Sequence, residues 1–289
     1  ILGDSFLEGW GVEYEKMLQT KLERNLDIEF YNFGSAGDFG PVQYYLIHKH
    51  LAKKFEHDEL FIFLTPNNDF TDNNYQKWKN IKSYFASGSE RYRPYYLKID
   101  NQNYTHFYPQ NAVKREYFLS ASGGILNELK NFLRKYFWTY NAYVSFKHYL
   151  ISKNIQENSN QTFKLSGYSG YQDPSIEEQK ALVYFVKKII NESNAKKIYV
   201  ILIPRLSEIK RLKKQNKKLN VFWYNNLKNL TKDNNIFFLD LMKYSINLEN
   251  PDKLYIWCDG HLSDLGNEFF ANKISDFYNS KKKVISINE

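Results

Sequence analysis

The sequence is poor in cysteine and in long apolar runs, and both shortages restrict what the chain can be. Cys258 is the single cysteine among 289 residues, so an internal disulfide and a sulfur-rich metal site are excluded. The longest apolar runs, ELFIFLT (59–65) and KIYVILIP (197–204), are far shorter than the roughly 20 residues that cross a bilayer. We therefore expect no membrane span in the chain as given. One cysteine fits a reducing compartment and is also compatible with export, so the localisation stays open.

Acidic residues are fewer than basic residues in this chain. The chain has 40 Lys and Arg against 32 Asp and Glu, a formal net charge of +8. Such an excess invites a polyanionic partner. The lysines are scattered, however, and the densest run, KRLKKQNKK (210–218), falls on an expected helix without any RNA- or DNA-binding signature. We predict that this run is a solvated helix face and that the chain has no nucleic-acid partner.

Aromatic residues, in contrast, are abundant and make up 18% of the chain. One interpretation is that some rings form platforms for sugars. The simpler one is that a sequence rich in Asn, Lys, Tyr and Phe reflects the base composition of its genome. Trp10 and Trp257 each stand close to a polar motif, where they either border a pocket or pack in the core.

Short apolar runs alternate with helical patterns at both ends of the chain. Ile1-Leu2 is too short for the strand that should precede Gly3-Asp4-Ser5, so we expect further residues upstream. The other expected strands are 28–33, 59–65, 197–203 and 235–241, and the expected helices are 13–25, one from Pro41, one capped by Ser175, one reaching about 230 and one after Ser263. Five strands with helices between them predict a doubly wound α/β fold.

Residues 75–174 do not follow this alternation. Within them, RPYYLKIDNQNYTHFYPQ predicts a hairpin that turns at residues 100–103, and residues 124–151 predict one long amphipathic helix. We expect residues 1–289 to form a single domain in which 75–174 is an insertion. Insertions of this size in α/β proteins tend to cover the end of the sheet that carries function.

Polar residues follow four of the five expected strands. They are Gly3-Asp4-Ser5, NFGSAGDFG (32–40), TPNNDF (65–70) and WCDGHLSDLGN (257–267). Because the carboxyl ends of parallel strands meet at one edge of a sheet, we expect these residues to lie together.

The residue types in this set are those that acyl transfer requires. A serine becomes nucleophilic when a histidine takes its proton, and Ser5 and His261 supply this pair. Asp259 is our choice for the group that orients His261, although a backbone carbonyl is an alternative. The backbone N–H groups of Ser5 and Gly37 and the side-chain amide of Asn68 are the predicted donors to the oxyanion.

In these residues the sequence resembles the GDSL, or SGNH, hydrolases and acyltransferases. The four blocks of that family match Gly3-Asp4-Ser5, Gly37 in NFGSAGD, Asn68 in PNND, and Asp259 with His261 in DGHLSDLGN, in the right order. The resemblance implies a flavodoxin-like three-layer α/β/α sandwich with a five-stranded parallel sheet whose first strand is truncated here. It also implies an acyl-enzyme on Ser5 and no metal or organic cofactor.

Two positions depart from the family pattern. Pro66 replaces the usual glycine of the third block, and Asp259 stands two residues before His261 where the usual spacing is three. Branches that resemble envelope polysaccharide acetyltransferases share the shorter spacing.

Three functions are open at this stage. Serine-dependent hydrolysis of a small-molecule or glycan ester ranks first. O-acetyl transfer to or from a cell-envelope glycan is close behind, because its chemistry is identical up to the acyl-enzyme. The third is a catalytically silent carbohydrate-binding module. The acyl group, the alcohol and the oligomeric state stay open.

Overall fold

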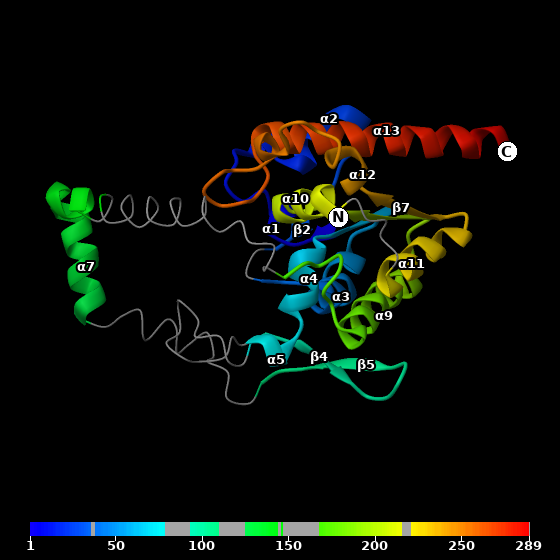
Figure 1. The fold of residues 1–289 in the computed structure, drawn as a ribbon, viewed down its shortest axis with the longest axis horizontal. Coiled ribbons are helices and arrows are strands. Elements are labelled where there is room, and N and C mark those ends of the chain that lie inside the picture. Colours follow the sequence, from blue (N-terminus) through cyan, green and yellow to red (C-terminus); the bar gives the residue numbers. More distant parts are fainter. Residues whose placement is uncertain are drawn as a thin grey trace. The chain divides into compact units, whose positions relative to one another are not determined.

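A five-stranded, all-parallel sheet is the framework of the part of the chain that carries both termini (Figure 1). The structure is a computed structural model, and it describes residues 1–35, 38–78, 93–109, 125–143, 146, 168–215 and 221–288. The strands are β1 (Leu2–Gly3), β2 (Phe33–Gly34), β3 (Glu59–Leu64), β6 (Lys197–Leu202) and β7 (Ile236–Asp240). Their order, β2-β1-β3-β6-β7, is that of flavodoxin-like sheets. The prediction of an α/β fold with a five-stranded parallel sheet is confirmed.

Helices lie on both sides of this sheet. They are α1 (Ser5–Glu8), α2 (Leu18–Leu26), α3 (Pro41–His50), α4 (Pro66–Asp72), α5 (Tyr75–Trp78), α9 (Ile176–Glu192), α10 (Leu206–Gln215), α11 (Phe222–Asn229), α12 (Met242–Ser245) and α13 (Asp264–Asn288). Helix α2 packs against α13 in one layer, and α3, α9 and α11 form the other (Figure 1). The arrangement is a three-layer α/β/α sandwich.

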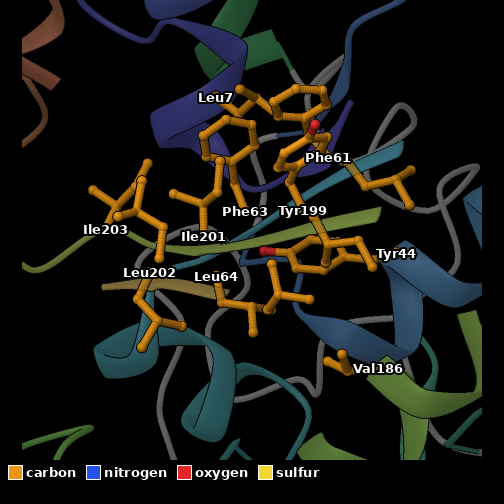
Figure 2. Packing of buried hydrophobic residues seen from close by; sticks show 14 of the residues in the cluster. Leu7, Tyr44, Phe61, Phe63, Leu64, Val186, Tyr199, Ile201, Leu202 and Ile203 are labelled. Atoms are coloured by element: carbon orange, nitrogen blue, oxygen red, sulfur yellow. The ribbon is translucent and has the colours of Figure 1, made fainter. Parts of the chain in front are cut away.

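Strands β3 and β6 are buried on both faces of the sheet, which explains their continuous apolar sequences. On one face Phe61 stacks on Tyr199, with ring centroids 4.4 Å apart, and both rings approach Tyr278 of α13. On the other face Leu64 and Leu202 point toward the layer that contains α3 and α9 (Figure 2). Each such side chain stabilises the fold by about 1.5–3 kcal/mol relative to exposure. This packing holds the carboxyl ends of the strands in fixed positions.

The helix starts follow the capping signals. Ser175 Oγ accepts a hydrogen bond from the Glu178 backbone N–H, and the Glu178 carboxylate accepts one from the Ser175 N–H, at 3.3 and 2.8 Å. This is the predicted capping box. Ser263 Oγ accepts from the Gly266 N–H at 3.1 Å, so the predicted cap of the last helix is confirmed as well.

Two predicted helices are wrong in extent. The helix expected to run to about 230 is divided, because Val221 is extended immediately before α11 begins. The helix expected over 124–151 is interrupted, because α7 (Ile125–Tyr136) ends before Phe137, which is not helical. The aromatic run KYFWTY (135–140) lies at this point, and aromatic residues have low helix propensity. Residues 147–151 are outside the described part of the chain.

The chain divides into two compact units. The first contains Ile1–Lys77, Pro94–Phe107 and Tyr168–Glu289, and the second contains Trp78–Arg93 and Tyr108–Gly167. The predicted hairpin is present as antiparallel β4 (Tyr95–Lys98) and β5 (Tyr104–Phe107), in the same unit as the sheet. That the rest of the predicted insertion covers the functional end of the sheet stays a prediction. In the described ranges, every helix is too short or too polar to cross a membrane.

Candidate active site

Ser5 is fixed by the turn that follows strand β1. Asp4 is buried, and its Oδ1 accepts a hydrogen bond from the Phe6 N–H at 3.0 Å, which caps α1. Ser5 is therefore the first residue of a short helix at the carboxyl edge of the sheet. Ser5 is half-buried, whereas the next two residues, Phe6 and Leu7, are buried in the core.

The hydroxyl of Ser5 meets His261, which is 256 positions further along the chain. Ser5 Oγ lies 2.7 Å from His261 Nε2, and Asp259 Oδ1 is bonded to His261 Nδ1 on the other side of the ring. An ionised carboxylate only accepts hydrogen bonds, so Nδ1 carries the proton. The lone pair of Nε2 is then free to accept the hydroxyl proton of Ser5. Ser5, His261 and Asp259 thus form a hydrogen-bonded triad.

A tight loop presents His261 to Ser5. The loop is closed by a hydrogen bond from the Ile256 N–H to the His261 carbonyl and by another from the Gly260 N–H to the Ile256 carbonyl, both 2.8 Å long. Gly260 has φ of +87°, a left-handed conformation that glycine adopts without strain. The ring of buried Phe6 lies 4.9 Å from the imidazole ring between centroids. The imidazole is therefore held by its neighbours as well as by its hydrogen bonds.

Asp259 makes more than one contact, although its side chain is one-third exposed. Trp10 Nε1 donates to Asp259 Oδ2 at 3.1 Å, and the His261 backbone N–H donates to Oδ1 at 3.2 Å. Partial burial raises the pKa of Asp259, but the interactions with His261 and Trp10 outweigh it and hold the pKa below the usual value. The carboxylate stays ionised at neutral pH. The alternative in which a backbone carbonyl orients His261 is wrong.

Asn68 reaches the same place from the helix that follows β3. Pro66 is the first residue of α4, a position that suits proline, so the departure from the family's glycine does not disturb the turn. Asn68 Nδ2 donates to Asp4 Oδ2 at 3.2 Å, and Arg205 Nη1 donates to Asn68 Oδ1 at 3.0 Å. Its neighbour Asp69 accepts from the Thr65 N–H at 2.7 Å and braces the loop.

A cavity of about 300 Å³ opens over the triad. Its lining residues are Asp4, Ser5, Trp10, Asp38, Phe39, Asn68, Asp72 and His261. Of the two alternatives for Trp10 and Trp257, packing in the core is wrong, because they are 53% and 75% exposed. Trp10 borders the cavity. A larger cavity, of about 410 Å³, lies near the start of β3 and contains none of the predicted site residues.

The structure brings together Ser5, His261, Asp259 and Asn68, as the sequence predicts. Gly37 lies outside the described residues, so its role as a donor stays a prediction. In the described part of the chain, no three His, Cys, Asp or Glu side chains are grouped as metal ligands.

Sequence reasoning missed Arg205. This residue comes shortly after β6, the one strand whose following residues were not considered. Applying the strand-end rule to all five strands would have found it.

Comparisons with known proteins identify no relative that shares this geometry. No family model, no curated protein and no solved structure matches the chain.

Proposed function

We propose that this protein is a serine-dependent acyl-ester hydrolase that acts through an acyl-enzyme. The observation that carries the proposal is the triad, with Ser5 Oγ 2.7 Å from His261 Nε2 and Asp259 bonded to Nδ1. Nothing in the packing of α1 requires a hydroxyl that is bonded to an imidazole at the border of a cavity. A turn residue would not need this partner.

Each proton and bond in the reaction has a place. Ser5 Oγ attacks the acyl carbon while His261 Nε2 takes the hydroxyl proton, and Asp259 stabilises the resulting imidazolium. The tetrahedral intermediate collapses, its bond to the alcohol oxygen breaks, and His261 returns the proton to the departing alcohol. Water then attacks the acyl-serine with His261 as base, which releases the carboxylic acid and restores Ser5.

The oxyanion of that intermediate needs hydrogen-bond donors. The backbone N–H of Ser5 is at the start of α1 and has no partner within the helix. Asn68 supplies a side-chain N–H at the border of the same cavity. Removing one such donor typically costs a factor of about 100 to 1,000 in kcat.

The resemblance to SGNH hydrolases supports the same proposal independently of the geometry. The four blocks occur in order along the chain, and three of the four contribute side chains to the described site. The mechanism uses protein groups alone, so the proposal needs no cofactor.

O-acyl transfer to a glycan is the second candidate, and Trp10 favours it. Its indole ring borders the cavity, is 53% exposed and is fixed through Nε1 to Asp259. A rigid, exposed aromatic face next to the nucleophile suits the apolar face of a sugar ring. In that reaction a sugar hydroxyl replaces water as the acceptor of the acyl group.

The test compares the wild type with Ser5→Ala in the hydrolysis of 4-nitrophenyl acetate, with and without an oligosaccharide acceptor. Ser207→Ala is the matched control, because Ser207 is exposed on α10 and does not border the cavity. We expect Ser5→Ala to lose activity by a factor of at least about 1,000 and Ser207→Ala to keep it. A fluorophosphonate probe should label Ser5 in the wild type.

The outcomes separate the three functions. Gain of one acetyl group by the oligosaccharide, measured by mass spectrometry, would favour transfer over hydrolysis. Equal rates for the wild type and a folded Ser5→Ala variant would overturn the catalytic proposal and leave a binding module.

A further inference from the structure

Arg205 contacts the candidate site from the strand that supplies none of its predicted residues. It follows β6 after Ile203 and Pro204, and its side chain is half-buried. Its Nη1 donates to Asn67 Oδ1 at 3.1 Å and to Asn68 Oδ1 at 3.0 Å. Both acceptors are in the first turn of α4. The guanidinium thus binds the start of the helix that carries Asn68.

The partners of Asn68 determine which way its amide points. A guanidinium has donors and no acceptor, whereas an ionised carboxylate has acceptors and no donor. The amide oxygen must therefore face Arg205 and the amide nitrogen must face Asp4, as the distances of 3.0 and 3.2 Å indicate. The reversed amide would set two donors against each other and two acceptors against each other. One N–H of Asn68 is used by Asp4, and one is left.

We propose that Arg205 is a positioning residue that fixes the side-chain amide of Asn68 so that its remaining N–H serves the acyl oxyanion. The inference rests on the proposed esterase function. Asn68 borders the cavity beside Ser5 and His261, whereas Arg205 is not among the lining residues. Arg205 therefore acts through Asn68 and does not contact the substrate.

The charge of Arg205 adds to this orientation. A hydrogen bond from a charged donor is about twice as strong as a neutral one. It also polarises the amide, so the N–H on the opposite side becomes a better donor to a negative oxygen. A neutral partner at this place would orient Asn68 but would polarise it less.

The guanidinium is itself held in place. Its central carbon lies 5.8 Å from the centroid of the Phe6 ring, which packs under His261. The Tyr255 hydroxyl donates to the carbonyl of Pro204, the residue before Arg205, and so ties this segment to the His261 loop. Arg205 has no carboxylate partner in the described part of the chain, so its bonds to the two asparagines are its main polar contacts.

The test is a double-mutant cycle between Arg205 and Asn68, read as kcat and KM for 4-nitrophenyl acetate. The variants are Arg205→Met, Asn68→Ala and their combination. Lys214→Met is the control for loss of a positive charge, because Lys214 is exposed on α10 and away from the cavity.

We expect Arg205→Met to lower kcat by a factor of about 10 to 100 and to change KM by less than about threefold. Asn68→Ala should cost a larger factor, and adding Arg205→Met to it should change kcat by less than about threefold. Arg205→Lys keeps one charged donor and should be intermediate. Lys214→Met should match the wild type.

Three results would go against the inference, and they are distinguishable. If Arg205→Met keeps kcat within twofold while Ser5→Ala is inactive, the positioning role is wrong and the esterase function stands. If the two losses multiply, Arg205 does not act through Asn68. If Ser5→Ala is as active as the wild type, the esterase function itself fails. Should Arg205→Met not fold, as judged by circular dichroism, Arg205→Lys takes its place in the cycle.

Discussion

Asp259 is exposed for a residue that must hold a histidine in one orientation. One-third of its side chain is accessible, and an exposed hydrogen bond contributes little when a side chain is free to rotate. The bond from Trp10 Nε1 to Oδ2 removes that freedom, because Oδ1 is then directed at His261. The short spacing between Asp259 and His261 is therefore combined with a tether from the loop after α1.

This tether predicts the effect of Trp10→Phe, which keeps an aromatic ring and removes the N–H donor. Loss of one hydrogen bond to a charged group costs about 1.5–3 kcal/mol, so kcat/KM for an aryl ester should fall about 10- to 150-fold. The pKa of Asp259 should rise, because Trp10 is one of the groups that lower it. The titration of the Asp259 carboxyl group, followed by NMR, should therefore move to higher pH.

Trp257→Phe is the matched control, because this ring is 75% exposed and does not border the cavity. A Trp10→Phe variant with the rate and the Asp259 titration of the control would show that Asp259 needs no tether.

At the scale of elements, the position of α4 depends on the segment around Gly170, which follows the second unit in the sequence. A Cβ added at Gly170 would lie 2.1 Å from the Pro66 carbonyl carbon and 2.3 Å from the Asn67 nitrogen. Glu208 of α10 is buried, accepts from Ser169 Oγ and from the Gly170 N–H, each at 2.7 Å, and so holds this contact together. Two separate segments, Ser169–Gly170 and α10, therefore fix the start of α4.

Gly170→Ala should disturb stability and catalysis together. The new methyl group meets backbone, which cannot rotate away, so we expect a loss of about 1–3 kcal/mol in the free energy of unfolding. Because α4 must move, Asn68 should leave its place and kcat should fall more than KM rises. Urea unfolding and steady-state kinetics measure the two effects. A destabilised variant with unchanged kcat would mean that the start of α4 does not set the position of Asn68.

The sheet and the triad are predictable from sequence because their signals are local. Buried parallel strands such as β3 and β6 are continuous apolar runs, and the strand-end rule gathers Ser5, Asn68 and His261 at one edge. Gly170 has no such signal in a single sequence, and the place of Arg205 after β6 does not tell which residue it contacts. Their roles come from contacts 137 and about 100 positions away, and neither an arginine after a strand nor a glycine in a loop marks a contact by itself.

The extents of helices are predicted less well for a related reason. Residue type and spacing suggest one helix to about 230, but the extended conformation of Val221 ends that pattern before α11. Trp223 of α11 is fully buried against Phe70 and Tyr171, so the packing of this ring sets where the helix begins. Tertiary packing overrides local propensity there.

For the whole molecule, two buried titratable groups far from the triad influence stability in opposite directions. Asp240 at the end of β7 is buried, and burial raises its pKa to about 6. Its protonated form is favoured in the folded state, so it makes the protein less stable as pH rises from about 4 to about 6. His48 of α3 is buried without a hydrogen-bond partner among the described residues, and burial lowers its pKa to about 4. The unfolded chain takes up this proton first, so His48 makes the protein less stable as pH falls through the same range.

Single substitutions should separate these opposed contributions. Each pKa is displaced by roughly two units, which corresponds to about 3 kcal/mol. Relative to the wild type, Asp240→Asn should gain about that much stability between pH 4 and pH 7, because the carboxylate is no longer buried at the higher pH. His48→Leu should gain a similar amount in the reverse direction, from pH 7 to pH 4.

Urea unfolding at pH 4, 5.5 and 7 measures both differences, and curves parallel to that of the wild type would show that neither group titrates differently on folding. Because both residues lie outside the cavity, such opposite slopes would separate the pH dependence of the fold from that of the triad.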